Sequence, residues 1–403
     1  MFRKCAGTSR FVYNWGLAEW QRQYEVGEKP SQYGLRGQFN GIKDEECPWI
    51  REIPYAVTEA AFYSLDLAFK NYFRQKKDGT VARRIETLKR QGKWKRRVAK
   101  LLKRGRKNTD PGYPQFKKRG HSDSFQLKGT KVEHDRVYLS SARNGPSIGW
   151  VRLKERGYIP TTDSGAEFGV YATVSRRADR WFISMQVEEE IPALENGNTL
   201  ILGVDFGLKA LAVCSDGTVF ENPHALRQEE RKLARLQREL SRRQKGGQNW
   251  RKTKRKIGRC HARIANIRKH ALHQVSHYIT AKAKPSMVVL EDLNVSGMMQ
   301  NHHLSKAISD VGFYELRRQT EYKADWNGVK VLIADRFYPS SKTCSECGAV
   351  KSVLKLSERI YVCSECGVII DRDLNAAMNL AALAEGQNMA GLPVELGCNS
   401  APL

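Results

Sequence analysis

The sequence has no apolar run long enough to cross a bilayer, which argues against a membrane-spanning chain or a membrane partner. It begins Met1-Phe2-Arg3-Lys4, without the apolar stretch and small-residue cleavage site of a secretory signal. Its nine cysteines, four of them in one tight arrangement, are not the pattern of a secreted disulfide framework. We therefore expect a protein of a reducing, cytoplasmic compartment.

Acidic residues are scarce compared with basic ones. The chain of 403 residues has 69 Lys and Arg against 43 Asp and Glu, a formal net charge of +26. Such an excess predicts a polyanionic partner, with nucleic acid the first choice. A generic basic protein of ribosome or chromatin is the less specific alternative. The length allows two to four domains.

The N-terminal half changes character twice. Residues from about 8 to 77 have apolar residues at helical spacing, which predicts packed helices. Residues 83–107 contain 13 Lys or Arg and one acid, and predict either a basic helix on a phosphate backbone or a solvated surface insertion. From about 113 to 190 the pattern favours strands, with a hairpin of 168–174 and 181–187 around a polar turn at 176–180.

The C-terminal half alternates strands with helices, which indicates an α/β domain. Buried-strand patterns at 199–205 and 286–291 both end in an acid, and 329–334 predicts a third strand. Residues 225–283 predict a helical hairpin that turns at Gly246 and Gly247. Its outer face should be positive, because residues 227–259 hold 14 basic residues against three glutamates.

Four cysteines have the spacing of a zinc ribbon. Two C-x-x-C pairs are separated by 15 residues, and a glycine follows each pair. Two residues between paired thiolates let both reach one tetrahedral ion, and four protein ligands leave no open position. We therefore predict a structural zinc site, with disulfides as the minor alternative; the ligands are Cys344, Cys347, Cys363 and Cys366.

Three carboxylates lie at the end of a predicted strand or at the start of a predicted helix, where each is a candidate functional residue. Asp205 ends a buried strand between glycines, and Glu291 follows five mostly apolar strand residues. Asp373 opens an Ala-rich helix, where it could be merely an N-cap. If the three converge, their repulsion requires divalent cations, as in two-metal phosphodiester hydrolysis. Spacing alone leaves this and the simpler roles open.

The motifs around these acids resemble a known family. GVDFG at 203–207, LEDLNV at 290–295 and DRDLNAA at 371–377 resemble the three RuvC motifs of TnpB, the insertion-sequence nuclease related to type V CRISPR effectors. FYPSSKTCSECG at 337–348 resembles the start of its zinc ribbon. SRFVYNW at 9–15, FKNYFR at 69–74 and PQFK at 114–117 also fit, so the similarity covers nearly the whole chain.

The resemblance implies a multidomain α+β fold. A helical recognition region would span 1–110, with a basic insertion at about 78–110, followed by a small β-barrel wedge domain at 111–195. An RNase H-like (RuvC) α/β nuclease domain would span 196–386 and include the helical hairpin 225–283 and the inserted four-cysteine zinc ribbon at 337–369. Residues 387–403 would form a mobile tail.

The resemblance also implies an RNA-guided DNA endonuclease with Asp205, Glu291 and Asp373 as catalytic Mg²⁺ ligands, for two ions. Its partners would be a guide RNA from the mobile element and a double-stranded DNA target beside a short motif read by the protein. We expect it to be a monomer with its RNA, in a bacterial cytoplasm, and on the nucleoid when bound to DNA. The nucleic-acid contacts that we expect are Tyr33, Lys70, Arg74, Lys117 and Lys118.

The chain departs from the family pattern at its start and in the basic stretch. Family members begin with a strand before the segment that matches 9–15, and its absence predicts a shifted start, a truncation or a barrel completed differently. An RNA-guided DNA-binding protein that represses without cutting is the main alternative function. A DDE transposase and a zinc-ribbon transcription factor follow, and the latter leaves Glu291 unexplained.

Overall fold

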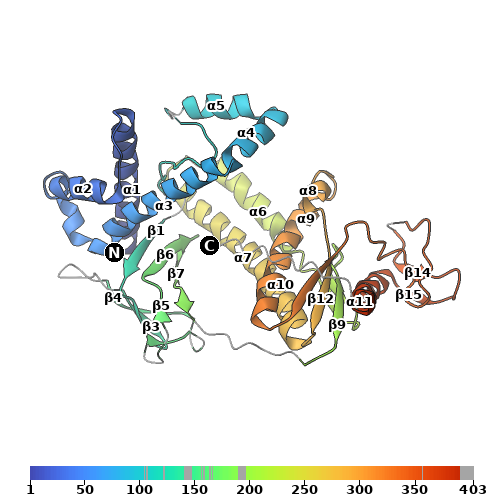
Figure 1. Ribbon diagram of the computed structural model, residues 1–403. Helices are drawn as coiled ribbons and strands as arrows, with labels where there is room; N and C mark the ends of the chain where they lie inside the picture. Colours follow the sequence, from blue (N-terminus) through green and yellow to red (C-terminus); the bar gives the residue numbers. More distant parts are fainter. Residues whose placement is uncertain are drawn as a thin grey trace. The chain divides into compact units, whose positions relative to one another are not determined.

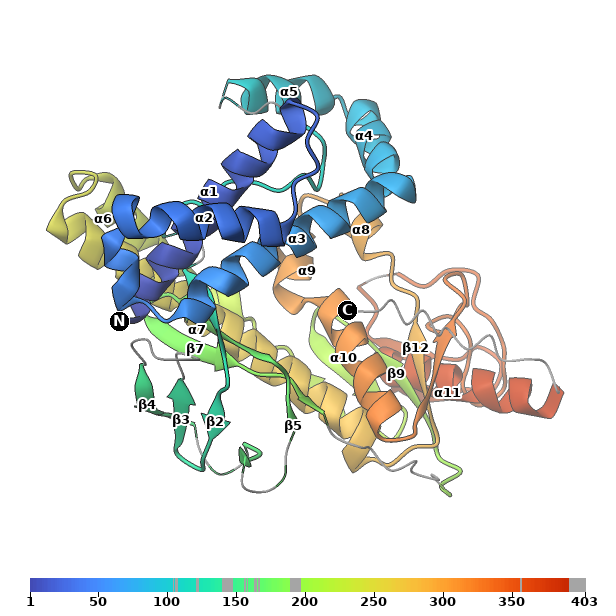
Figure 2. The same cartoon turned by 60° about the vertical axis from the view of Figure 1, so that its left-hand side comes forward.

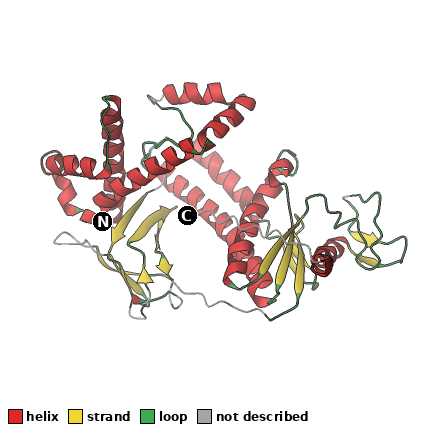
Figure 3. Cartoon of the chain, viewed as in Figure 1, coloured by secondary structure: helices red, strands yellow, loops and turns green. Residues whose placement is uncertain are grey.

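The chain folds into two units, Met1–Glu190 and Ile191–Leu403, each containing helices and sheets (Figure 3). The structure, a computed structural model, describes residues 1–103, 105, 108–120, 123–139, 148–155, 157, 159–162, 165, 167–188, 197–355 and 357–390, without the side chains of 387–390. Across these ranges, no helix combines the length and apolar character needed to cross a membrane.

The first unit begins with helices whose apolar stripes pack on one another (Figure 1). Aromatic residues dominate this core, since Phe39, Phe62 and Phe69 are almost fully buried. Ser31 caps the second helix by accepting from the Gly34 N–H at 3.1 Å. The helices are α1 (Phe2–Glu25), α2 (Gln32–Glu46), η1 (Pro48–Glu52) and α3 (Tyr55–Lys77).

The basic stretch forms two short helices, α4 (Thr80–Arg90) and α5 (Trp94–Leu102), rather than one. The break falls at Gly92, whose φ of 65° lies in the left-handed region that ends helices. Each helix buries only one residue, Val81 in α4 and Leu101 in α5. The stretch is therefore helical in two pieces, and its two predicted roles, phosphate binding or a solvated insertion, stay predictions. We call α4 and α5 together the basic arm.

Short strands complete the first unit. They form three sheets, in the orders β1-β6-β7, β2-β3-β4 and β5-β8, around one apolar core (Figure 2). The turn between β6 and β7 is shorter than the predicted 176–180, because Arg176 pairs with Trp181 and Arg177 pairs with Arg180 in the ladder of these strands. The strands are β1 (Ser124–Lys128), β2 (Lys131–Val132), β3 (Arg136–Leu139), β4 (Gly149–Arg152), β5 (Glu167–Phe168), β6 (Tyr171–Arg177), β7 (Arg180–Ser184) and β8 (Val187–Glu188).

The second unit is built on a five-stranded sheet of order β11-β10-β9-β12-β13. Strands β9, β12 and β13 are parallel, and β10 and β11 are antiparallel to their neighbours. The central strands are buried on both faces, which explains their continuous apolar sequences. The strands are β9 (Ile201–Asp205), β10 (Ala210–Cys214), β11 (Val219–Glu221), β12 (Met287–Glu291) and β13 (Lys330–Ala334).

Helices cover both faces of this sheet. Leu202, Val204 and Leu290 face the core shared with α7 and α10, whereas Met287 and Val289 face α11 (Figure 1). The predicted hairpin is present as α6 and α7, and a two-stranded ribbon, β14-β15, precedes α11. The elements are α6 (Ala225–Ser241), α7 (Gln248–His277), η3 (Tyr278–Lys282), α8 (Val295–Met298), α9 (Ser305–Val311), α10 (Phe313–Trp326), β14 (Ile360–Val362), β15 (Ile369–Asp371) and α11 (Arg372–Ala390).

The predicted domain limits stay predictions. The limit at 195–196 falls among residues 189–196, outside the described part of the chain, and the limit at 110–111 lies within the first unit. The tail predicted from 387 is partly helical, because α11 continues to Ala390, and 391–403 lie outside the described residues.

Candidate active site and metal centre

Two of the predicted acids lie at the same edge of the central sheet. Strands β9 and β12 are parallel, and Val204 pairs with Leu290. Asp205 and Glu291 are the next residues on the two strands, so they stand side by side where both strands end. Neighbouring strands are about 4.8 Å apart, which brings the two carboxyl groups close together.

The third acid is brought to this edge by an unusually close helix–strand contact. A Cβ on Gly203 would lie 2.0 Å from the carbonyl oxygen of Ala377 and 2.6 Å from the backbone nitrogen of Ala381. Only glycine permits α11 to approach β9 so closely. Because Asp373 lies in the first turn of α11, this packing carries it to the end of β9.

The two aspartates at the start of α11 have different roles. Oδ1 of Asp371 accepts from the N–H of Asp373 at 2.9 Å and from that of Leu374 at 3.1 Å. Asp371 therefore caps the helix by satisfying backbone donors that no helical carbonyl can reach. This removes the simpler explanation of Asp373 as the N-cap.

Asp205 is partly buried and lies within reach of the charges of the other two acids. Burial raises the pKa of Asp205 from 3.8 to about 7, assisted by the charges of Glu291 and Asp373 and opposed by Arg372. Burial, with the charge of Asp292, also raises the pKa of Glu291. Ionising these carboxyls together is unfavourable in the protein alone, and a bound divalent cation would relieve that repulsion.

The carboxylates are not clustered as tightly as the cysteines. Among the described residues, the four cysteines are the one set of three or more metal-ligand side chains whose ligand atoms all lie within 4.8 Å of one another. Asp205, Glu291 and Asp373 form a wider arrangement. Two-metal sites separate their ions by about 3.5–4 Å, so their ligands need not all meet at one point.

Two arginines that the sequence did not single out lie beside Glu291. Arg317 donates to Asp292 at 3.1 Å, and Arg336 donates to the other oxygen of the same carboxylate. Asp292 is thus paired with two cations. Glu291, Arg317 and Arg336 line a pocket of about 260 Å³ together with Phe206 and Tyr314. No spacing rule connects positions 25 and 44 residues apart from Asp292, which is why these arginines were missed.

The four predicted zinc ligands converge. The sulfurs of Cys344 and Cys366 are 3.6 Å apart, as are those of Cys347 and Cys363. Tetrahedral zinc with bonds of about 2.3 Å places its sulfurs about 3.8 Å apart, so the spacing fits zinc and far exceeds a disulfide bond. The backbone N–H of Cys366 donates to the Cys363 sulfur and lowers the pKa of that thiol, whereas the neighbouring thiols raise the pKa of Cys347 and Cys366, because the four groups titrate together without a metal.

The ribbon is attached to α11 by two buried asparagines. Asn375 accepts from the Ser345 N–H at 3.0 Å and donates to the Thr343 carbonyl at 2.7 Å. Asn379 donates to the carbonyls of Ser340 and Thr343, both at 2.7 Å. The same helix therefore supports Asp373 and holds the segment that leads into the first cysteine pair.

The residues predicted to contact nucleic acid have different surroundings. Tyr33 is exposed, with the Arg36 guanidinium 5.7 Å from its ring centre. Lys70 pairs with Asp66 at 2.9 Å, and Arg74 donates to Asn71 at 3.3 Å. The Lys117 ammonium lies 4.0 Å from the centre of the Tyr13 ring, and burial lowers its pKa. Lys118 is exposed. All five contacts stay predictions.

Models of three protein families match the chain. A model described as a probable transposase matches residues 182–302, and one described as a Cas12f1-like TNB domain matches residues 313–380. A helix-turn-helix model matches residues 1–29, where the structure has the single helix α1 followed by a turn.

Curated relatives cover nearly the whole chain. The putative RNA-guided DNA endonuclease InsQ of Escherichia coli (strain K12) is 32% identical over 416 residues, covering 98% of this chain and 91% of that protein. The chain belongs to the TnpB family. A putative RNA-guided DNA endonuclease of Streptomyces pristinaespiralis, another relative of this TnpB-family chain, is 32% identical over 388 residues, covering 96% and 86% of the two chains.

More distant relatives include CRISPR effectors. The CRISPR-associated endodeoxyribonuclease Cas12f1 of Sulfoacidibacillus thermotolerans is 27% identical over 220 residues, covering 51% of the TnpB-family chain and 50% of that protein. A solved Cas12f1–sgRNA–target DNA complex matches with 14% identity and a TM-score of 0.34, covering 94% of this chain and 93% of that one.

Proposed function

We propose that this chain is an RNA-guided DNA endonuclease whose second unit contains a RuvC-like nuclease domain. The observation that carries the proposal is that Asp205 and Glu291 stand side by side at the ends of β9 and β12, and that Asp373 lies in the first turn of α11, the helix packed on β9. Family membership supports the same activity, because relatives that cover the chain almost completely are named putative RNA-guided DNA endonucleases.

The strand order adds support for the proposed nuclease domain. Three parallel strands, two antiparallel strands on one side and helices on both faces are the arrangement expected of an RNase H-like domain. In open α/β sheets, ligands bind at the carboxyl ends of the strands. Asp205 and Glu291 stand at that edge.

The donor set fits hard divalent cations. Carboxylate oxygens are the ligands that Mg²⁺ prefers. Burial raises the pKa of Asp205, and the negative charges of Glu291 and Asp373 raise it further. Asp205, Glu291 and Asp373 would hold two such ions. When bound, the metals would supply an activated water and stabilise the leaving oxygen of the cleaved phosphodiester.

The chain's own groups keep this site ordered and attract the substrate. Gly203 allows α11 to pack directly against β9, and Asp371 caps the first turn of that helix. The two arginines that pair with Asp292 add positive charge beside Glu291. In the α6–α7 hairpin all three glutamates are paired with cations, which leaves a large excess of basic residues for a phosphate backbone.

The proposed partners are a guide RNA and a double-stranded DNA target beside a short motif. Base pairing with the guide would select the sequence, and the protein would read the adjacent motif and hold the backbones. We propose a monomer bound to one RNA. The four cysteines would carry one structural zinc ion, because their spacing matches a closed tetrahedral site.

The proposal is tested by co-expressing the chain with the DNA that flanks its gene. The purified complex is then given a plasmid library with random bases beside a guide-matched target, in Mg²⁺. We expect selective loss of plasmids that carry one adjacent motif. Asp205→Ala and Glu291→Ala should abolish this loss and keep RNA binding, whereas the exposed control Asp325→Ala should cut normally.

Two results would count against the proposal in different ways. Cutting retained by Asp205→Ala would refute the assignment of the metal site. An intact protein–RNA complex that binds target DNA but never cuts would favour the alternative, an RNA-guided repressor.

A further inference from the structure

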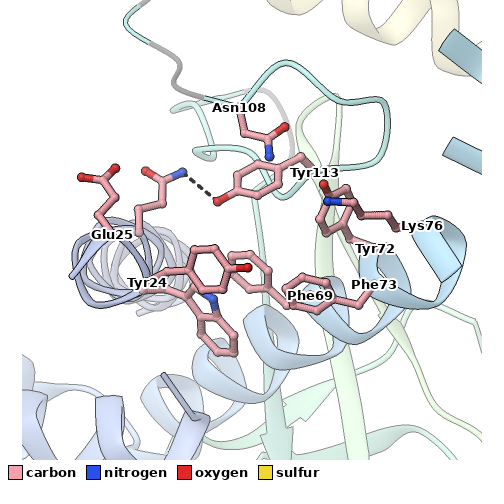
Figure 4. Close-up of a pocket in the computed structure, with 10 residues that line it drawn as sticks. Tyr24, Glu25, Phe69, Tyr72, Phe73, Lys76, Asn108 and Tyr113 are labelled. Atoms are coloured by element: carbon pink, nitrogen blue, oxygen red, sulfur yellow. Dashed lines mark hydrogen bonds between the residues drawn. The ribbon is translucent and has the colours of Figure 1, made fainter. Parts of the chain in front are cut away.

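The first unit contains an aromatic pocket that the nuclease chemistry does not use. It lies between α1, the C-terminal part of α3 and the segment around Tyr113, and its volume is about 250 Å³ (Figure 4). Drug-sized ligands occupy pockets of about 300–1,000 Å³, so this one suits a smaller, flat group.

The pocket has a rigid wall and an open mouth. In the wall, Trp20 and Phe69 stack at 4.2 Å with their planes 9° apart, and Tyr113 meets Phe69 edge to face at 5.6 Å. At the mouth, Tyr24 is 63% exposed and Phe73 is 41% exposed. Exposed rings beside a packed aromatic wall offer stacking surfaces to a planar ligand.

Polar groups at the rim suit the edge of a nucleobase. The Gln21 amide donates to the Tyr113 hydroxyl at 3.4 Å, and Asn108, whose side-chain oxygen accepts from the Asp110 N–H at 2.8 Å, lies next to Tyr113 (Figure 4). Amide side chains both donate and accept, which matches the mixed edges of unpaired bases. The Lys76 ammonium lies 6.0 Å from the centre of the Tyr72 ring, at the rim.

The pocket lining contains one acid, Glu25, and one base, Lys76, but the chain beside the mouth is strongly basic. The last turn of α3 carries Arg74, Lys76 and Lys77, and the basic arm follows directly. Arg84 of the arm donates to Gln75 of α3 at 2.9 Å, which ties the start of the arm to the helix that forms the mouth. Since residues 80–102 of the arm include nine basic residues and one acid, a phosphate chain can pass from the mouth along the arm.

We propose that this pocket binds one unpaired base of the guide RNA, stacked on Tyr24 and Phe73, with the basic arm on the flanking phosphates. The proposal rests on the proposed function for the identity of the RNA. It assigns the basic stretch a role in RNA binding, and it makes α3 the element that joins base stacking to phosphate binding. Stacking on aromatic side chains is how proteins hold splayed bases of single-stranded RNA.

The test uses the full-length protein, freed of bound RNA, and the RNA transcribed from the DNA that flanks its gene. The variants are Tyr24→Ala and Phe73→Ala, the conservative Phe73→Trp, and the control Trp49→Ala, which removes a ring of similar exposure outside the pocket. The measurements are Kd at low and moderate salt, and ultraviolet crosslinking followed by peptide mass spectrometry. Melting curves check that the variants fold.

We expect each mouth variant to weaken binding roughly 5- to 150-fold with an unchanged salt slope, because stacking contributes about 1–3 kcal/mol per base and releases no counterions. Phe73→Trp and Trp49→Ala should bind as the wild type does. Nucleotide adducts should fall on peptides that contain Tyr24 or Phe73. Replacing basic residues of the arm with Gln should instead lower the salt slope.

Affinities of both mouth variants within twofold of the wild type, without adducts at the pocket, would overturn the inference. Equal weakening by Trp49→Ala would also overturn it, since the loss would not belong to the pocket. If the wild type binds RNA through the pocket but never cuts DNA, the proposed nuclease activity is refuted and the proposed role of the pocket is supported. If it cuts DNA while the mouth variants bind normally, the pocket alone fails.

Discussion

Replacing Asp205 by Asn should stabilise the protein when Mg²⁺ is absent. The substitution keeps the shape of the side chain and removes a charge that burial and two neighbouring acids make unfavourable. Raising the pKa from 3.8 to about 7 corresponds to about 4 kcal/mol of destabilisation of the folded state above that pH. We take this as the upper limit, equivalent to roughly 8–16 °C in Tm for a unit of this size.

The pH dependence has a definite sign. A carboxyl whose folded pKa is raised binds its proton more tightly in the folded state between pH 3.8 and about 7. Wild-type stability should therefore fall across this window as pH rises, and the full penalty should remain above it. Asp205→Asn lacks this group, so its advantage should be small near pH 4 and largest above about pH 8.

The assay is thermal unfolding followed by circular dichroism in Mg²⁺-free buffer at several pH values. Chelators are left out, because they would also remove zinc from the cysteine site. Asp325→Asn, an exposed acid of the same unit, is the matched control for the change in net charge. Millimolar Mg²⁺ should close the gap by stabilising the wild type more. A variant no more stable than the control at high pH would refute the electrostatic reasoning.

Three further substitutions test the supports of the site. Gly203→Ala should lower the free energy of unfolding by about 1–3 kcal/mol and abolish cleavage, because its Cβ displaces α11. The control Gly386→Ala, with no atom within 4 Å of its Cβ, should do neither. Equal melting points of the two variants would contradict this packing. Cys363→Ser should lower the zinc content and Tm together, and an unchanged zinc-to-protein ratio would exclude the zinc site. Asn375→Ala removes two buried hydrogen bonds and should lower Tm and cleavage while the protein retains zinc. A loss of zinc equal to that of Cys363→Ser would show instead that the asparagine supports the cysteines themselves.

Local patterns predicted much of the second unit. Buried strands ending in Asp205 and Glu291, the helical hairpin and the cysteine spacing are all short-range signals, and the structure contains each of them. The choice of Asp373 over Asp371 for the site came from resemblance. The structure supplies a physical reason, because Asp371 is occupied as the helix cap.

Contacts between distant segments could not be predicted from those patterns. Arg317 and Arg336 reach Asp292 through tertiary packing, and Asn375 reaches Ser345 across 30 positions. The sequence places Asp205 between two glycines but does not indicate that the first of them, Gly203, meets the backbone of α11. In the first unit, the helix break at Gly92 was missed because the charge pattern continues through it.

The contact between β9 and α11 also bears on the moment at which the protein becomes active during its synthesis. Asp373 is made 168 residues after Asp205, the difference between their positions. At about 5–20 residues per second, the ribosome needs roughly 10–30 s to cover this interval. Until α11 emerges, the sheet lacks the helix that carries the third carboxylate. A nascent chain would therefore carry an incomplete candidate site, and would complete that site only after most of the second unit had been translated.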